Sequence, residues 1–254
     1  MRKFRIWAIG DLHLSFGVKN KSMDIFGPQW ENHAQKIASH WKSMIDPADL
    51  VLVPGDLSWA LKLEDAVPDL QWVDDLPGTK VMIKGNHDYW WGSLKKIAEV
   101  LPPSIHLIQN NAFHWKDVAI GGARLWDTPE YSFGSYIEFR ENPREKEKNL
   151  EEMIQEDLSQ KIFERELERL KMSLKALDPK AAVRIAMTHY PPIGADLKEP
   201  SRAGQILEQN GIQICVFGHL HNIGPGHSLF GEKNNVRYVL TSCDYLRFQP
   251  IAIL

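Results

Sequence analysis

The sequence is poor in cysteine. Only two cysteines, Cys215 and Cys243, occur among 254 residues, whereas small secreted folds that rely on disulfides carry many more. Both lie in apolar or strand-like surroundings, so we expect them to be reduced and to pack in the core. This scarcity excludes a disulfide framework, argues against a structural zinc site made of thiolates, and favours the cytoplasm.

An excess of one charge sign is also missing. The formal net charge is −3 at pH 7, which gives no broad positive surface for nucleic acid, so we expect no such partner. No uncharged apolar stretch approaches the ~18 residues that cross a bilayer. The first apolar run, residues 4–9, is soon interrupted by Asp11 and His13, and no small-residue cleavage site follows. We therefore expect neither a membrane partner nor a signal peptide.

Apolar residues are abundant. They make up 43% of the 254 residues, enough for the core of one large domain or of one domain with an insertion. Period-two and short apolar stretches predict strands at residues 4–9, 50–53, 80–83, 105–108, 112–115, 118–120, 183–187, 212–217, 236–240 and 248–254. Helical spacing predicts helices at 31–44, 63–75, 93–100 and 144–177. Because strands and helices alternate, the sequence favours an α/β fold.

Five short polar blocks each follow one of the predicted strands. They read GDLH at 10–13, GD at 55–56, GNHD at 85–88, THYPP at 188–192 and GHLH at 218–221. Together they contain seven side chains of the kinds that bind metals: Asp11, His13, Asp56, Asn86, His189, His219 and His221. Four blocks open with glycine, which we expect to let the chain turn sharply. Strand ends are where α/β sheets place ligands, so we expect one shared site.

The donor set indicates a pair of divalent ions. Carboxylate oxygens, imidazole nitrogens and one amide oxygen suit Mn²⁺, Fe²⁺, Co²⁺ or Zn²⁺. In an extended strand end, Asp11 and His13 would point to the same face and bind one ion together, as would His219 and His221. Seven ligands exceed what one ion takes from protein, so we expect two ions bridged by one carboxylate. Two ions about 3.5–4 Å apart activate water for attack on phosphorus.

His87 and Asp88 are the predicted catalytic residues. His87 lies between a predicted ligand, Asn86, and the carboxylate of Asp88. A histidine in this position can donate a proton to a leaving oxygen, and the adjacent carboxylate can fix its tautomer.

The five blocks, in this order, resemble the calcineurin-like metallophosphoesterase superfamily. Its pattern is GDxH, GD, GNHD or GNHE, a later His, and GHxH, and all five elements are present between residues 10 and 221. By position, the resemblance implies one metal site formed by Asp11, His13 and His221 and a second formed by Asn86, His189 and His219. It further implies that Asp56 bridges the ions and that His87 is a general acid or a hydrogen-bond donor to phosphate.

The resemblance also implies an architecture and a reaction. We expect two mixed β-sheets packed face to face, flanked by helices in four layers. Residues 1–254 would form a single domain, with a specificity insertion and a long helix at about 124–177. The expected activity is hydrolysis of a small phosphorylated substrate, phosphomonoester or phosphodiester, with two divalent ions, of which Mn²⁺ is the first choice in vitro. The oligomeric state stays open.

Two sequence differences from other branches of the superfamily, and one alternative function, bear on this hypothesis. Protein serine/threonine phosphatases of the superfamily carry GDxxDRG and GNHE, whereas this chain has GDLSWA and GNHD, so we do not expect a protein phosphatase. The lipid-precursor hydrolases usually have arginine where this chain has His87. The alternative is a catalytically weak or inactive protein-binding scaffold, which would be expected to lose ligands, yet the full set is present.

Aromatic and cationic residues near the blocks have two interpretations each. Four tryptophans adjoin the blocks, and either pack in the core or form a rim for a base or sugar: Trp59, Trp90, Trp91 and Trp126. Three cations either contact phosphate or are ordinary surface charges: Lys84, Arg124 and Arg202.

Overall fold

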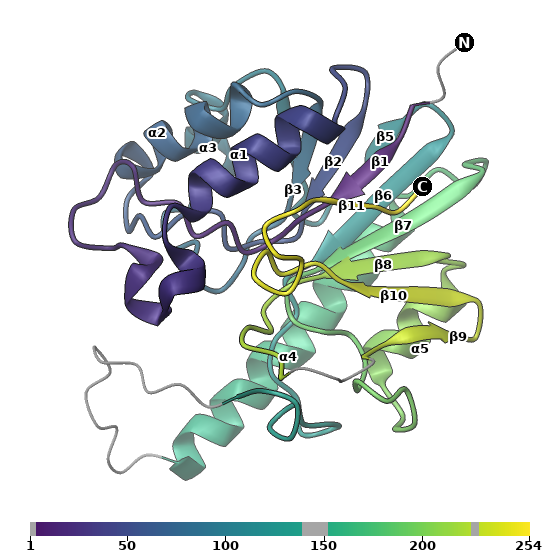
Figure 1. Cartoon of the computed structure of the whole chain (residues 1–254). Helices are drawn as coiled ribbons and strands as arrows, with labels where there is room; N and C mark the ends of the chain where they lie inside the picture. Colours follow the sequence, from purple (N-terminus) through teal and green to yellow (C-terminus); the bar gives the residue numbers. More distant parts are fainter. Residues whose placement is uncertain (1–3, 139–151, 225–228) are drawn as a thin grey trace.

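Two β-sheets form the frame of the protein in a computed structural model that describes residues 4–138, 152–224 and 229–254 (Figure 1). The first sheet has the order β11-β1-β2-β3-β4. Its strands are β1 (Ile6–Ala8), β2 (Leu50–Val53), β3 (Thr79–Met82), β4 (Ile105–Leu107) and β11 (Ile251–Ala252). The first four run parallel and β11 pairs antiparallel with β1.

The second sheet has the order β5-β6-β7-β8-β10-β9. Its strands are β5 (Phe113–Trp115), β6 (Val118–Ala123), β7 (Val183–Thr188), β8 (Ile214–Phe217), β9 (Gly231–Lys233) and β10 (Val236–Leu240). Strands β6, β7, β8 and β10 run parallel, while the edge strands β5 and β9 are antiparallel. Both sheets are therefore mixed, as predicted.

Apolar alternation along the strands creates the layers. Leu50 and Leu52 of β2 belong to a core cluster that joins strands of both sheets, whereas Val51 and Val53 pack in a second cluster with Trp41 of the helical layer. A strand buried on both faces needs such an uninterrupted apolar run. Helices α1 (His33–Met44), α2 (Leu63–Asp74) and α3 (Leu94–Ala98) cover the first sheet. The four-layer α/β prediction is confirmed.

Helix α4 (Glu152–Lys175) and helix α5 (Arg202–Gln209) cover the second sheet. The sequence predicts a helix at 144–177, of which residues 144–151 lie outside the described part. Leu158, assigned to the apolar stripe, is 56% exposed instead. Helix α5 was not predicted. Its N-cap is Ser201, whose hydroxyl accepts the N–H of Gly204 at 3.0 Å.

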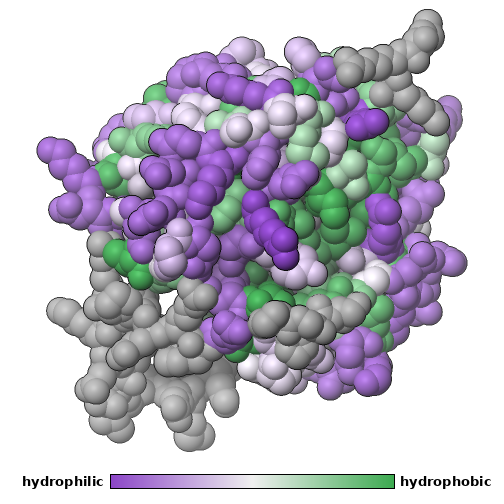
Figure 2. All heavy atoms as spheres, in the orientation of Figure 1, coloured by the Kyte–Doolittle hydropathy of each residue, from purple (hydrophilic) through white to green (hydrophobic). Residues whose placement is uncertain are grey.

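Parallel strands of both sheets end at the same edge, which positions the site. A bridge between Gly10 and Ser242 links the segments that follow β1 and β10. Strand β11 covers only Ile251–Ala252, so the last strand is shorter than predicted. Cys215 and Cys243 are free and buried. Among the described residues, no helix combines the length and apolar character needed to cross a bilayer. Figure 2 shows hydrophilic side chains beside a hydrophobic area on one face of the molecule.

Candidate metal centre

The structure brings all seven predicted ligands together between the carboxyl ends of the two sheets. Neighbouring members have polar atoms 2.6–3.9 Å apart. Strands β1, β2 and β3 supply the loops of Asp11, Asp56 and Asn86, and strands β7 and β8 supply those of His189 and His219. We call these seven residues the candidate metal centre, or metal centre for short: Asp11, His13, Asp56, Asn86, His189, His219 and His221.

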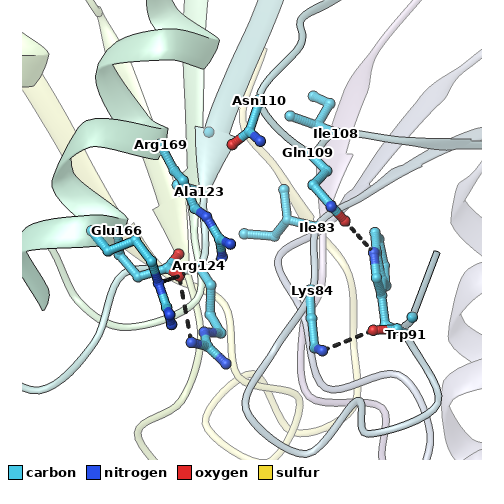
Figure 3. A pocket seen from close by; sticks show the side chains of 13 residues that line it. Ile83, Lys84, Trp91, Ile108, Gln109, Asn110, Ala123, Arg124, Glu166 and Arg169 are labelled. Atoms are coloured by element: carbon cyan, nitrogen blue, oxygen red, sulfur yellow. Dashed lines mark hydrogen bonds and ion pairs between the residues drawn. The ribbon is translucent and has the colours of Figure 1, made fainter. Parts of the chain in front are cut away.

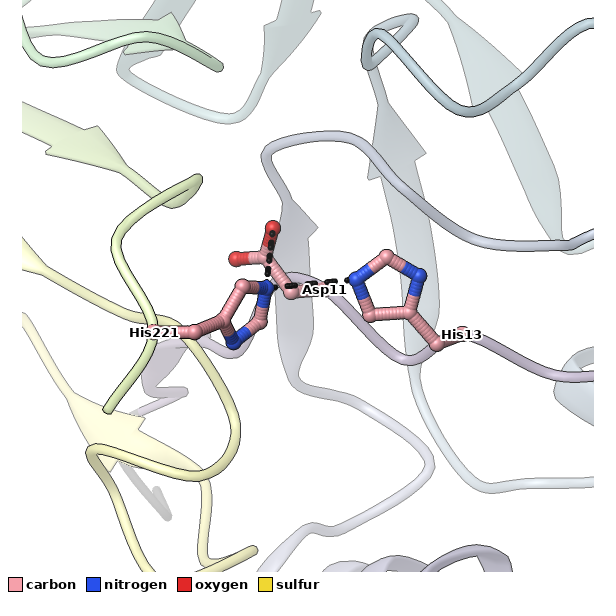
Figure 4. Close-up of side chains that lie close together, drawn as sticks. All are labelled: Asp11, His13 and His221. Atoms are coloured by element: carbon pink, nitrogen blue, oxygen red, sulfur yellow. Dashed lines mark hydrogen bonds and ion pairs between the residues drawn. The ribbon is translucent and has the colours of Figure 1, made fainter. Parts of the chain in front are cut away.

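Asp11, His13 and His221 form the first group (Figure 4). His13 Nε2 lies 3.2 Å from His221 Nε2, and His221 Nε2 lies 3.7 Å from Asp11 Oδ1. Two ring nitrogens that face each other beside a carboxylate are a suitable arrangement for a shared cation, since two unprotonated nitrogens cannot bond to one another.

Asn86, His189 and His219 form the second group. Asn86 Oδ1 lies 2.6 Å from His189 Nε2 and 3.1 Å from His219 Nδ1. Both histidine nitrogens and the amide oxygen thus converge on one place, and they include no sulfur ligand. Such a set of nitrogen and oxygen donors fits a divalent ion.

Asp56 lies between the two groups. Its Oδ2 is 3.8 Å from His13 Nε2 and 3.4 Å from His189 Nε2, which is the position expected of a bridging carboxylate. Asp11 Oδ1 also lies near both groups, 3.7 Å from His221 Nε2 and 3.9 Å from His189 Nδ1, but this second nitrogen is directed at the carbonyl of Pro54. Asp56 and Asp11 also occur together with His189 in a second cluster of possible ligands.

Contacts outside the metal centre orient the histidine rings. His189 Nδ1 donates to the carbonyl of Pro54 at 3.0 Å, and His221 Nδ1 donates to Asp244 Oδ1 at 2.8 Å. In the neutral form of both rings this leaves Nε2 unprotonated and directed at the centre. The His13 ring is stacked on Trp59, with centroids 4.9 Å apart. The orientation of these rings by second contacts is a feature of metal-binding histidines.

Asp244 was missed by the sequence analysis. It follows β10 in the stretch Thr241-Ser242-Cys243-Asp244, and its carboxylate is almost fully buried, at 8% exposure. The order of a buried strand followed by a polar residue was therefore present. The block lacks both the glycine and the histidine by which the other blocks were recognised.

The backbone of the ligand loops differs from the prediction. Strand β1 ends at Ala8, and Asp11 and His13 have φ values of 57° and 45°. Asp56 and His219 are also left-handed, with φ of 52° and 72°. The expectation that Asp11 and His13, or His219 and His221, share a face through extended geometry is thus wrong. Left-handed conformations cost free energy in non-glycine residues and cluster at functional sites.

Glycine does more here than permit the sharp turn predicted for the four blocks that open with it. Only Gly55 of the four block glycines has a positive φ, at 97°. At Gly85, an added Cβ would lie 2.0 Å from Asp56 Oδ1, and at Gly218 it would lie 2.1 Å from Asp11 Oδ2. These two glycines are required because the carboxylates occupy the space of a side chain.

Burial keeps most of the imidazoles neutral. It lowers the pKa of His219 to about 3 and that of His87 to about 4, and nearby histidines add to the effect. The pKa values of His13 and His189 are lowered well below 6.5 for the same reason. Neutral imidazole is the form that binds a metal ion.

The carboxylates show the complementary effect. Burial raises the pKa of Asp11 to about 6, and burial together with Asp88 and Asp11 raises that of Asp56 well above its usual value. Burial opposes protonation of His221, but Asp244, Asp11 and Asp56 outweigh it and raise its pKa to about 9. The buried acids thus attract positive charge, which bound cations would supply.

Asp88 does not contact the His87 ring in the predicted way. Its buried carboxylate accepts the backbone N–H groups of Gly85, Asp56, Leu57 and Ser58 at 2.8–3.2 Å, and the indole N–H of Trp90 at 3.0 Å. Among the described residues, His87 Nδ1 has no hydrogen-bond partner. Asp88 therefore fixes the Asp56 loop against the Asn86 loop, and the expectation that it sets the tautomer of His87 is wrong.

His87 nevertheless lies beside the metal centre. Its backbone N–H donates to Asp56 Oδ1 at 2.8 Å, and its ring is 5.6 Å from that of His13 and 4.5 Å from that of Trp59. Trp59 thus contacts two predicted functional histidines, whereas Trp90 and Trp91 are 3% exposed and pack in the core.

An aromatic pocket of about 330 Å³ adjoins the metal centre at His219. Its aromatic walls are Trp126, Tyr131, Phe133 and Tyr190, and Asp127 and Thr128 add polar groups. The Tyr190 ring lies 3.9 Å from that of His219 and 5.1 Å from that of Trp126. Arg202, by contrast, is not part of this pocket and forms ion pairs with Glu130 and Glu164.

The fold and the convergent donors define the class, an α/β protein with a candidate site for divalent metal ions. The sequence profile of calcineurin-like phosphoesterases matches residues 4–222, and the chain belongs to this family. The gene 66 proteins of Mycobacterium phages L5 and D29 are 31% and 30% identical over 86 and 83 residues, which cover 32% and 33% of this chain. The chain spans about two fifths of the length of these curated relatives, 39% and 40%.

A solved structure shares the fold. The crystal structure of AQ665, a protein of unknown function from Aquifex aeolicus, has a TM-score of 0.50 and 14% identity, and the alignment covers 98% of this chain and 96% of that chain. This likeness concerns the fold alone.

Proposed function

We propose that the protein hydrolyses small phosphoesters, monoester or diester, with two divalent metal ions, and that Mn²⁺ supports the reaction in vitro. The observation that carries the proposal is the position of Asp56 Oδ2, 3.8 Å from His13 Nε2 and 3.4 Å from His189 Nε2. One carboxylate oxygen that faces ligands of both groups is what a pair of ions requires.

The ligand assignment follows the two groups. Asp11, His13 and His221 would hold one ion, and Asn86, His189 and His219 the other, with Asp56 shared between them. When bound, the two ions would lower the pKa of a water molecule and neutralise phosphoryl oxygens. The buried carboxylates and neutral imidazoles of the chain provide the charge and the lone pairs that this site needs.

His87 would act on the substrate rather than on the metal ions. Its ring is partly exposed beside His13 and Trp59, and burial keeps its pKa at about 4. A neutral imidazole donates one hydrogen bond, so His87 is suited to hold a phosphoryl oxygen or the leaving oxygen. Asp88 would position the Asp56 loop through its backbone bonds.

The organic part of the ester would lie in the aromatic pocket. The volume of this pocket, about 330 Å³, lies in the size range of small-molecule sites. Two of its aromatic residues, Trp126 and Tyr131, come from the segment predicted to set specificity. The domain limits, 1–254 with an insertion at about 124–177, and the cytoplasmic location stay predictions.

The test compares p-nitrophenyl phosphate with bis-p-nitrophenyl phosphate, using metal-stripped protein reloaded with Mn²⁺. Hydrolysis that requires Mn²⁺ and falls in His87→Ala supports the proposal, and the preferred ester decides between phosphatase and phosphodiesterase. Trp126→Ala should raise KM for the aromatic ester more than for glycerol phosphate. If no ester is hydrolysed at full Mn²⁺ occupancy, the result would contradict catalysis and favour the protein-binding scaffold.

A further inference from the structure

A second cavity, of about 340 Å³, lies between the ends of the two sheets and helix α4. Its walls include Lys84 after β3, Gln109 after β4, Arg124 after β6, and Glu166 and Arg169 of α4 (Figure 3). None of its lining residues belongs to the metal centre. We call it the cationic cavity.

The cationic cavity carries more positive than negative charge. Four cationic side chains line it, against the single carboxylate of Glu166: Lys84, Arg124, Arg165 and Arg169. The formal excess is three positive charges. Cations gathered in a partly enclosed space repel one another, and this repulsion is relieved when an anion binds between them.

Glu166 cannot satisfy these cations alone. Its side chain is 1% exposed, and the single oxygen Oε1 faces Arg169 Nη1 at 2.7 Å, Arg124 Nη2 at 3.5 Å and Arg165 Nε at 3.9 Å. Arg124 is 16% exposed, and among the described residues its buried Nε has no hydrogen-bond partner. A buried donor without an acceptor costs free energy, so Arg124, which lines the cavity, has a donor left to satisfy.

Packing roles explain only part of this arrangement. Lys84 Nζ donates to the carbonyl of Trp91 at 2.9 Å, which uses one of the three N–H groups of an ammonium. The guanidinium of Arg124 lies 4.6 Å from the ring of Trp126. Neither contact supplies negative charge. Figure 3 shows Lys84 and Arg124 on opposite walls of the cavity, with the Lys84 ammonium directed at the carbonyl of Trp91 on its own wall.

We propose that the cationic cavity is an anion site that binds a phosphate-type oxyanion, held by Arg124, Arg169 and Lys84. Guanidinium groups pair with phosphate through several hydrogen bonds, and a lysine ammonium adds a point charge. Both walls continue into the metal centre, because Lys84 precedes Gly85 and Asn86, and the carbonyl of Arg124 accepts the N–H of His189 at 3.1 Å. The oxyanion is either a second phosphate group of the substrate or a free anion.

Binding is tested first, with inorganic phosphate as the probe. The full-length chain carries Asp56→Asn, so that the metal centre does not retain phosphate, and calorimetry is run at constant ionic strength. We expect one phosphate per chain and at least tenfold weaker binding after a further Arg124→Gln or Arg169→Gln change. The side chain of Arg169 is 41% exposed, so we expect the Arg169→Gln variant to fold. The matched control is Lys171→Gln, which removes the same charge from an exposed position of α4 that is paired with Glu168.

The binding experiment has two contradicting outcomes. The proposal is overturned if the Asp56→Asn protein binds no phosphate, or if Arg169→Gln and Lys171→Gln weaken binding equally. This experiment does not use catalysis. Phosphate binding can therefore be found when the proposed hydrolase activity is absent, and it can be absent when the activity is found.

The second arm separates the two sources with the Mn²⁺-loaded chain that has Asp56 intact. A series of alkanediol bisphosphates of rising length is compared with the matching monophosphates. If the second phosphate of the substrate is bound, one bisphosphate has a KM several-fold below its monophosphate, and Arg169→Gln removes the difference. If a free anion is bound, added phosphate changes kcat/KM for the monophosphate, and the size of this change differs between the unmodified chain and the Arg169→Gln variant. If the unmodified chain and the Arg169→Gln variant have identical kinetics in every assay, an effect of the cationic cavity on the metal centre is overturned.

Discussion

His221 Nδ1 donates a hydrogen bond of 2.8 Å to Asp244 Oδ1, and the other oxygen of Asp244 accepts the backbone N–H of Asn222 at 3.0 Å. The two bonds fix both the ring and the loop that carries it. The tautomer that results leaves Nε2 of His221 directed at Asp11 and His13. Asp244 is therefore a positioning residue for the proposed first metal site.

The first prediction is that Asp244→Asn weakens metal binding. The amide keeps the shape but removes the charge that raises the basicity of His221, so we expect affinity for Mn²⁺ to fall about 10–100-fold. Calorimetric titration of metal-stripped protein measures this. Asp196→Asn is the control, because that carboxylate is exposed and pairs only locally with Lys198. Unchanged affinity in Asp244→Asn would show that the bond does not act on the metal.

The second prediction separates the bridging residue Asp56 from the hydrogen-bond donor His87. Asp56→Asn should remove bound metal and all hydrolysis, because Asp56 faces both ligand groups. His87→Ala should retain both ions while kcat falls by about 10²–10³-fold, the usual effect of removing one hydrogen-bond donor to the charge that develops on the substrate. Metal content and initial rates measured on the same sample distinguish the two, with His40→Ala on α1 as the control. Loss of metal in His87→Ala would instead identify His87 as a ligand.

The sequence predicted the residues of the metal centre better than their geometry. Each of the seven lies in a segment that follows a buried strand. Folding brings these segments together because the parallel strands of both sheets have their carboxyl ends on the same side of the molecule. Their left-handed φ values and the close approach of Gly85 to Asp56 depend on tertiary contacts between distant loops. No local pattern encodes such contacts.

Two further differences have the same cause. Asp88 appeared to belong to His87 because the two are adjacent in sequence, yet its bonds go to the backbone of Asp56, Leu57 and Ser58, about thirty residues earlier. The cationic cavity joins Lys84 and Arg124 to α4, and nothing in the separate segments indicates that they meet.

The third prediction concerns the glycines that make room for carboxylates. In Gly218→Ala the new Cβ would lie 2.1 Å from Asp11 Oδ2, so Asp11 or the loop after β8 must move. We expect loss of bound metal and of activity, with a cost in stability of about 1–3 kcal/mol, typical of overpacking. Gly92→Ala is the matched control, since nothing lies within 4 Å of its added Cβ. Similar metal content in both variants would contradict the explanation.

The fourth prediction uses Asp69 of α2, which is fully buried. Its Oδ1 accepts the N–H of Phe16 at 2.8 Å, and its Oδ2 accepts the hydroxyl of Ser58. Burial raises the pKa of Asp69 from 3.8 to about 6. The folded protein therefore binds this proton more tightly than the unfolded chain does. The resulting stabilisation is complete below pH 3.8 and is lost as the pH rises through about 6.

Asp69→Asn tests this linkage, because the amide does not titrate. Between about pH 4 and pH 6 the unmodified protein should lose on the order of 2 kcal/mol of unfolding free energy relative to Asp69→Asn. Above about pH 7 the difference between the two proteins should be constant, because Asp69 is then ionised in both folded and unfolded states. Urea denaturation at a series of pH values measures the difference. Asp75→Asn removes a carboxylate from the exposed end of the same helix and serves as the control. Parallel pH profiles for the unmodified protein and Asp69→Asn would mean that Asp69 has the same proton affinity in the folded and unfolded chain, so that its two hydrogen bonds fully offset its burial.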